Sequence, residues 1–239
     1  MSGRNKHLYR ICLPILAGAL IFLSGCGARD VAPAPTSQTK GETMMKLPEP
    51  RYDSDFSLEK AIVERRSVRD YADQSLKLEE VSQLLWAAQG ITSESGLRSA
   101  PSAGALYPLE LYAVVGKVTG LDAGVYRYEP EGHQLAKVLS GDLRAALARA
   151  ALGQDSVGDG TVSFVFTAVY GRTTGKYGER GERYVHMEAG HAAENLLLEA
   201  VALGLGAVPI GAFYDDEVAK LLNLGAEEVP LYIIPVGRK

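Results

Sequence analysis

The stretch Thr161-Val162-Ser163-Phe164-Val165-Phe166-Thr167-Ala168-Val169-Tyr170 is the part of the sequence that decides the fold. It is rich in β-branched and aromatic residues, which predicts a strand in the centre of a sheet. A long helix is predicted after it, over residues 182–203. The second half of that helix is small or apolar on almost every side, so we expect it to be buried.

The elements on either side of this strand alternate irregularly. Helices are predicted over residues 58–66, 78–89, 142–152 and 215–222, and strands over residues 109–115, 205–212 and 229–236. A hairpin is predicted from residues 124–128 to residues 134–138, around Glu131-Gly132. This order predicts an α+β fold whose mixed sheet has helices on both faces, rather than a regular parallel series.

The composition is that of a folded protein and disfavours several functions. Of the 239 residues 46% are hydrophobic and 23% are charged, with a net charge of -4. This balance offers no positive excess to neutralise nucleic-acid phosphates. Both cysteines lie within the first 26 residues, which rules out a disulfide scaffold or a cysteine-rich zinc site. We predict no metal site.

The beginning of the chain has the pattern of an export signal. Three positive charges within the first ten residues precede an uncharged apolar run from Ile11 to Leu23. That run is shorter than the ~20 residues of a membrane-spanning helix. It ends in Leu23-Ser24-Gly25-Cys26, which resembles a bacterial lipobox. We expect residues 1–25 to be a cleaved lipoprotein signal and Cys26 to be lipidated; an uncleaved anchor helix is the alternative.

The segment after the signal is predicted to be a flexible tether. Residues 26–50 mix Pro, Ala, Thr, Ser and Lys without an apolar period. Residues 51–239 are enough for one domain with its own core. We therefore expect an extracytoplasmic protein that its lipid holds to a bacterial membrane, on the periplasmic side or at the cell surface.

Three arginines and a serine stand at the end of the first predicted helix, in Arg65-Arg66-Ser67-Val68-Arg69. A guanidinium group presents a planar fork of donors, which suits the oxygens of a phosphate. Arg238, next to the end of the chain, could join the same site. The alternative is a solvated helix end whose cations complement the negative end of the helix dipole.

Further segments have the properties of ligand-binding loops. Residues 100–108 carry few bulky side chains, so that the backbone could approach a flat ligand closely. Residues 175–181 form a polar, glycine-bracketed segment, in which Lys176 and Tyr177 could transfer protons. In residues 208–211, a proline and a glycine fix the backbone shape. Each segment alone is a weak signal, and an ordinary turn or surface loop is the alternative for each.

In order along the chain, these segments resemble the FMN-dependent nitroreductase superfamily. The resemblance covers residues 57–239 and is closest to the branch of SagB-type dehydrogenases and thiazole/oxazole oxidases. Two more segments contribute to it, Leu84-Leu85-Trp86-Ala87-Ala88-Gln89-Gly90 and Gly190-His191-Ala192-Ala193-Glu194-Asn195. The resemblance implies a nitroreductase-like α+β homodimer with an FMN in each of two sites at the subunit interface.

The resemblance also implies the roles of individual residues. The motif that holds the FMN phosphate and ribityl chain is matched by Arg65, Arg66, Ser67 and Arg69, with Arg238 as a second phosphate contact. The loop that borders the flavin from the partner subunit is matched by Pro101, Ser102 and Ala103. The backbone beside the isoalloxazine ring is matched by Pro209, Ile210 and Gly211. A pair linked to catalysis in azoline-oxidising members is matched by Lys176 and Tyr177.

We therefore expect an FMN-dependent oxidoreductase tethered to a bacterial membrane, which transfers hydride or electrons between flavin and a small molecule or peptide. An exported protein would have neither a cytoplasmic cyclodehydratase partner nor cytoplasmic NAD(P)H at hand. A membrane redox partner or an exported substrate would suit it better. The alternatives are a flavin- or small-molecule-binding lipoprotein without turnover, and a cytoplasmic azoline oxidase whose start is misread.

Overall fold

The computed structural model describes residues 44–239. The predicted signal peptide, Cys26 and the tether up to residue 43 lie outside these residues. The last part of the predicted tether belongs to the fold, since β1 (Met44–Lys46) pairs antiparallel with β6 (Gln134–Ser140). Leu47 follows and is only 3% exposed. The tether prediction is wrong for this segment, because its apolar side chains are too few to form a recognisable period.

A seven-stranded sheet forms the centre of the described part, in the order β1-β6-β5-β3-β7-β9-β8. All neighbouring strands of this sheet are antiparallel. A parallel bridge between Ser67 and Ala207 of β8 makes the sheet mixed at that edge. The remaining bounds are β3 (Leu109–Val115), β5 (Gly124–Glu129), β7 (Val162–Val169), β8 (Leu205–Ala207) and β9 (Glu228–Arg238). A separate parallel pair consists of β2 (Leu76–Lys77) and β4 (Val118–Thr119).

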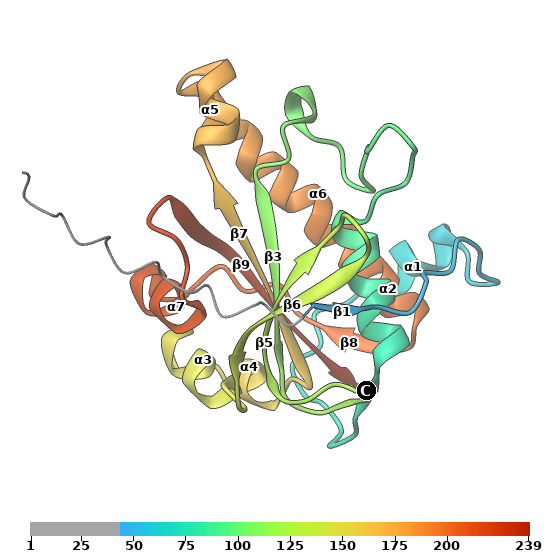
Figure 1. Cartoon of the computed structure of the whole chain (residues 1–239). Helices are drawn as coiled ribbons and strands as arrows, with labels where there is room; N and C mark the ends of the chain where they lie inside the picture. Colours follow the sequence, from blue (N-terminus) through green and yellow to red (C-terminus); the bar gives the residue numbers. More distant parts are fainter. Residues whose placement is uncertain (1–43) are drawn as a thin grey trace, which may run out of the picture. The chain divides into compact units, whose positions relative to one another are not determined.

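Helices cover both faces of the sheet (Figure 1). The elements α2 (Leu78–Gln89) and α6 (Arg180–Ala202) lie on one face, and α3 (Arg144–Ala150), α4 (Asp155–Asp159) and α7 (Asp215–Leu222) on the other. The others are α1 (Leu58–Glu64), α5 (Gly171–Tyr177) and the 3-10 turn η1 (Ala103–Ala105). No helix within residues 44–239 is long and apolar enough to cross a membrane.

The core has two halves, one on each face of the sheet. Side chains alternate along a strand, so Leu111 and Ala113 of β3 pack toward α2 and α6, whereas Tyr112 and Val114 pack toward α3 and α7. The central strand β7 is buried from Val162 to Ala168, because both of its faces are covered. The α+β fold with helices on both faces is therefore confirmed.

Two predicted segments differ from the structure. Residues 175–181 are not a loop, since α5 ends at Tyr177 and α6 begins at Arg180. Gly178 separates the two helices in a conformation with φ 58°, which favours glycine. The strand predicted over residues 205–212 ends at Ala207, because Pro209 has no N–H for the ladder. Pairing returns only as a single bridge between Ile210 and Ile233.

Candidate active site

The basic segment after α1 lies along the edge strand β8. Ser67 forms a bridge with Ala207, and the backbone N–H of Val68 donates to the Ala207 carbonyl at 2.9 Å. The hydroxyl of Tyr71 donates to the carbonyl oxygens of Val68 and Pro235, at 2.8 and 3.1 Å. Burial raises the pKa of Tyr71, so this hydroxyl stays protonated as a donor. These bonds fix the path of residues 65–69.

Arg238 reaches the same edge from the end of β9. It pairs with Leu205 of β8, and its carbonyl accepts from the N–H of Ala72 at 2.9 Å. Its Nη2 lies 2.7 Å from Oε2 of Glu80, at the beginning of α2. The structure therefore places Arg238 beside the segment that contains Arg65 to Arg69, although 169 positions separate Arg69 from Arg238 in the sequence.

The donors at this edge fit an anionic group such as the phosphate of FMN. Arg65 Nε lies 3.6 Å from Glu194 Oε1, and Arg66 Nη1 donates to the carbonyls of Val63 and Arg65 at 2.9 and 2.7 Å. Arg66 and Arg69 are exposed. Each guanidinium has five N–H donors, so these contacts leave donors for a ligand oxygen.

Pro209, Ile210 and Gly211 continue along the same side of β9. Ile210 exchanges two backbone hydrogen bonds with Ile233, at 2.8 and 2.9 Å. Gly211 is exposed, and a Cβ at this position would lie 3.8 Å from the nearest atom, in the Tyr232 ring. The backbone at Gly211 is therefore accessible to a flat ligand.

Lys176 and Tyr177 lie at a second location, at the end of α5. A Cβ on Gly104 would be 2.9 Å from Lys176 Nζ and 2.9 Å from the Tyr177 hydroxyl, so both side chains pack on the loop that contains Ser102 and Ala103. Gly104 has φ 65°. The Tyr177 ring also packs edge-to-face on Tyr184 of α6, with centroids 5.2 Å apart. The structure thus joins the predicted proton-transfer pair to the predicted Pro101–Ala103 loop.

Glu188 is a buried titratable residue that sequence reasoning missed. It lies on α6, is 2% exposed, and faces Ser102. Burial raises the pKa of Glu188 to about 7, against the smaller effects of Ser102 and Arg98. One signal in the sequence could have found it, because it lies three residues after Val185 and four before Ala192, on the buried face of the helix.

The two locations lie at opposite ends of the sheet. Val169 at the end of β7 bonds to Pro108, next to the Pro101–Ala103 loop, whereas Val162 at its beginning pairs with Val236, two residues before Arg238. The seven residues of β3 span a similar length, about 20 Å at ~3.3 Å per residue. In Figure 1, α5 and the C-terminus likewise lie at opposite ends. One chain therefore does not bring the arginines to Lys176 and Tyr177.

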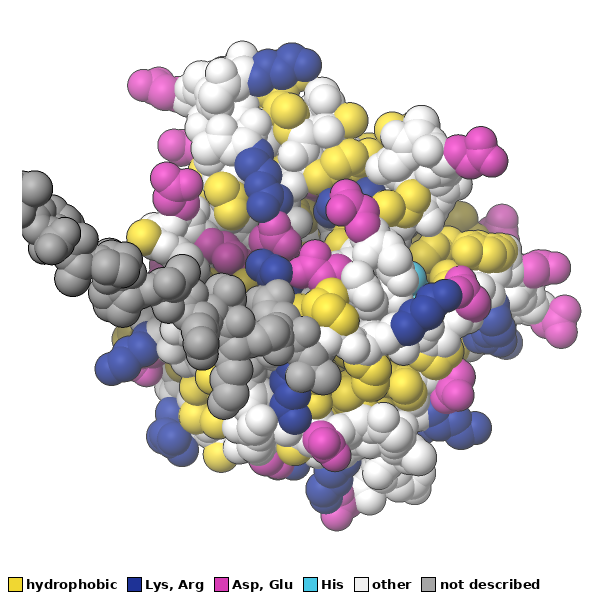
Figure 2. Space-filling view, in the orientation of Figure 1, with side chains coloured by type: hydrophobic (Ala, Val, Ile, Leu, Met, Phe, Trp, Pro, Cys, Tyr) yellow, Lys and Arg dark blue, Asp and Glu magenta, His cyan; other side chains and the backbone are white. Residues whose placement is uncertain are grey.

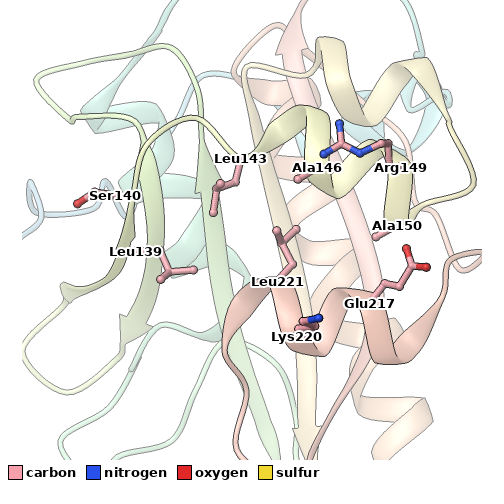
Figure 3. A pocket seen from close by; sticks show the side chains of 9 residues that line it. All are labelled: Leu139, Ser140, Leu143, Ala146, Arg149, Ala150, Glu217, Lys220 and Leu221. Carbon is pink, nitrogen blue, oxygen red and sulfur yellow. The ribbon is translucent and has the colours of Figure 1, made fainter.

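A groove on the α3 and α7 face is separate from both locations (Figure 3). Leucine and alanine side chains line most of it, together with Ser140, Arg149, Glu217 and Lys220. None of the predicted site residues lines it. The face seen in Figure 2 intersperses Lys and Arg with Asp and Glu and has no broad basic patch.

A family model described as the nitroreductase family matches residues 62–238, about three quarters of the chain. The chain belongs to the nitroreductase family. This nitroreductase-family protein is 46% identical, over 200 residues, to a Methanocaldococcus jannaschii protein that carries the name nitroreductase; the match covers 83% of this chain and 98% of that protein.

Two more similarities bear on fold and branch. A crystal structure of a Ralstonia eutropha protein, also named as a nitroreductase, superposes with a TM-score of 0.73 and 33% identity, covering 82% of this chain and 90% of that chain. The microcin B17-processing protein McbC of Escherichia coli is 32% identical over 143 residues, 57% of this chain and 52% of McbC. The protein is thus a nitroreductase-family oxidoreductase related to McbC.

Proposed function

We propose that the protein is an FMN-dependent oxidoreductase that works as a homodimer and transfers hydride or electrons between flavin and a small molecule or peptide. The observation that carries this proposal is the set of arginines that β8 and β9 bring to one edge. Arg65, Arg66 and Arg69 surround Ser67, and Arg238 lies beside them. Charge-assisted donors of this kind suit the phosphate of FMN better than they suit a neutral ligand.

Bound FMN would supply a ring that takes up or gives back a hydride. The protein's own groups would hold and orient it. The guanidinium groups and the Ser67 hydroxyl would bind its phosphate and ribityl chain, and the backbone of Pro209, Ile210 and Gly211 would lie beside the ring. The exposed Gly211, without a side chain, allows that close approach.

Lys176 and Tyr177 are proposed as the catalytic pair. Hydride movement at a substrate is coupled to movement of a proton, and a Tyr hydroxyl with a neighbouring ammonium can donate or accept it. Their packing against Gly104 supports this role, since it places both polar groups beside the Pro101–Ala103 loop. The relation to McbC, which is named for the processing of microcin B17, favours a peptide among the candidate substrates.

A homodimer is proposed because the arginines and the catalytic pair lie at opposite ends of the sheet within one subunit. A second copy would supply the Pro101–Ala103 loop with Lys176 and Tyr177 to the arginines of the first. An exposed apolar surface supports this. On α1, Leu58, Ile62 and Val63 are 61%, 59% and 68% exposed. Such a cluster beside Arg65 is typical of an interface.

The location is proposed from the sequence alone. The Leu23-Ser24-Gly25-Cys26 segment would place a lipid on Cys26 after residues 1–25 are removed, and so hold the enzyme to the outside of a bacterial membrane. Mass spectrometry of the N-terminal peptide should find an acylated cysteine. A native protein that begins at Met1 would contradict this location, and would leave the proposed chemistry unaffected.

Calorimetric titration of flavin-free protein with FMN and with riboflavin tests the phosphate site. Arg69→Ala and Arg66→Ala should each weaken FMN binding by about 10- to 100-fold, because one charge-assisted contact contributes ~1.5–3 kcal/mol. Riboflavin has no phosphate and should bind both variants as it binds the wild type. Arg149→Ala on α3 is the matched control. Equal losses for riboflavin and FMN would contradict a phosphate role for these arginines.

A further inference from the structure

The loop that carries Pro101, Ser102 and Ala103 lies along helix α6. Near one end of the loop, Asn195 Nδ2 donates to the Ser99 carbonyl at 3.3 Å, and near the other end Glu188 faces Ser102. Asn195 and Glu188 are seven residues apart, or about two helical turns and ~10 Å. Ser99 and Ser102 are three residues apart, which spans ~10 Å in an extended chain. The two spacings match, so α6 lies in register with the loop at both points.

The hydroxyl of Ser102 can still donate one hydrogen bond, and the Glu188 carboxylate is the acceptor that it faces. Its Oγ accepts from the backbone N–H of Tyr107 at 2.9 Å, so the hydroxyl proton is available to a second partner. Within residues 44–239, Oε1 of Glu188 is buried without a hydrogen-bond partner in the static structure. A small shift of the Ser102 and Glu188 side chains would let the hydroxyl donate to this oxygen, and an unsatisfied buried carboxylate is costly.

We infer that Glu188 is a positioning residue of the flavin site, which fixes the Pro101–Ala103 loop by accepting a hydrogen bond from the Ser102 hydroxyl. The inference rests on the proposed function, because it assigns the loop to the flavin. Glu188 itself need not touch the flavin. It acts through Ser102, and its effect should therefore disappear when the Ser102 hydroxyl is removed.

The charged surroundings of Glu188 make the contact sensitive to pH. Arg98, in the segment between α2 and β3, is the charged group that acts on the carboxylate, and Arg98 itself lies in the fields of Glu110 and Arg172. The ionised carboxylate is the stronger acceptor for Ser102. Burial raises the pKa of Glu188 to about 7, so the contact strengthens as the pH rises through neutrality.

The test compares FMN binding by wild type, Glu188→Gln, Ser102→Ala and the double variant, from pH 5.5 to pH 8.5. Glu188→Gln keeps the shape of the side chain, so folding is preserved. Its FMN Kd should be about tenfold higher than wild type at pH 8.5 and nearly equal at pH 5.5. The ratio of the two values at each pH cancels titration of the FMN phosphate. The double variant should be no weaker than Ser102→Ala alone.

Hydrogen exchange in the flavin-free proteins supplies a second readout. Backbone amides of residues 99–105 should exchange faster in Glu188→Gln than in wild type. Their exchange rates should stay at the wild-type values in Glu182→Gln, a control substitution at an exposed position of the same helix. A pH-independent Kd ratio with unchanged exchange would overturn the inference. If wild type takes up no FMN, the proposed function fails, and the exchange measurement still decides whether Glu188 anchors the loop.

Discussion

Gly104 illustrates how one residue can be required both by the backbone and by its neighbours. Its φ of 65° strains any residue with a Cβ, and that Cβ would also lie 2.9 Å from Lys176 Nζ and the Tyr177 hydroxyl. Gly96 has φ 79° but nothing within 4 Å of its Cβ position. A comparison of substitutions at these two glycines therefore separates the effect of backbone strain from the effect of displacing Lys176 and Tyr177.

We predict that Gly104→Ala and Gly96→Ala each lower the free energy of unfolding by about 1–2 kcal/mol, because both place a Cβ in the left-handed region. Only Gly104→Ala should also slow turnover, by up to ~10²-fold, because it displaces Lys176 and Tyr177. Thermal melting and steady-state kinetics check this. Equal turnover in the two variants would mean that the position of the pair does not matter.

Tyr177→Phe should bind FMN normally and melt at the wild-type temperature, yet turn over its substrate ~10²–10⁴-fold more slowly. The aromatic ring, which packs on Tyr184, is retained and only the hydroxyl is lost. Lys176→Ala should behave in the same way. Stopped-flow measurement of flavin oxidation and reduction checks both variants. Full activity in both would show that Lys176 and Tyr177 are surface residues without a catalytic role.

The pKa of Glu188 predicts a pH dependence of stability. It rises from 4.5 to about 7 on folding, so the native state holds a proton that the unfolded chain has lost at intermediate pH. Stability should therefore fall as the pH rises from about 4.5 to 7, by at most ~3 kcal/mol. Urea titrations across this range should show a flatter profile for Glu188→Gln. The same slope in both proteins would contradict the raised pKa.

The arginines and Glu188 differ in how visible they are in the sequence. Three arginines within five residues suit an anion site by their chemistry, although the sequence leaves a solvated helix end as the alternative. Glu188 is one glutamate among the 29 acidic residues, and its importance arises from burial against Ser102, a residue 86 positions earlier. Its position on a buried helix face was a signal, but only the tertiary structure identifies its partner.

Among the secondary-structure elements, β1 determines where the folded domain begins, and substitutions in and beside it test that boundary. Leu47 follows β1 and packs in the main core at 3% exposure, whereas Met44 is 42% exposed. Leu47→Ala should lower the free energy of unfolding by about 2–5 kcal/mol, because it leaves a cavity. Met44→Ala should change it by less than about 0.5 kcal/mol. Urea denaturation measures both, and equal small effects would restore the boundary at Arg51.

The elements that sequence patterns predicted well are those with a clear apolar period. The helix at residues 78–89 and the strand at residues 109–115 were predicted to the residue. The pattern failed at residues 175–181, where glycines at 175, 178 and 181 suggested a loop. Gly175 lies within α5 and Gly181 within α6, where a Cβ would be 2.8 Å from the Thr174 backbone, so close packing of the two helices overrides the low helix propensity of Gly181. Short elements such as β1 and α4 carry too few residues for a period.

At the scale of the whole molecule, the exposed face of α1 is the proposed dimer contact. Ile62→Glu and Val63→Glu each place a charge in the centre of this apolar surface, and both should yield monomers. Leu152→Glu, after α3 on the other face of the sheet, starts from a 52% exposed side chain and should remain dimeric. Light scattering measures the masses. If all three variants remain dimers, α1 is not the interface.

The arrangement of the two site locations depends on strand register, which the sequence alone does not reveal. The sequence singled out the arginines, the Pro101–Ala103 loop and the Lys176–Tyr177 pair. It could not show that the last two meet at Gly104, or that the arginines lie at the other end of the sheet. Those facts follow from the pairing of β3, β7 and β9.

The molar ratio of FMN to chain in the purified native protein tests whether this protein is an FMN-dependent oxidoreductase. Absorbance of the flavin band against protein, with the released cofactor identified by mass spectrometry, gives this ratio. We predict about one FMN per chain. Protein that contains no flavin, and takes up none when FMN is added, would contradict it.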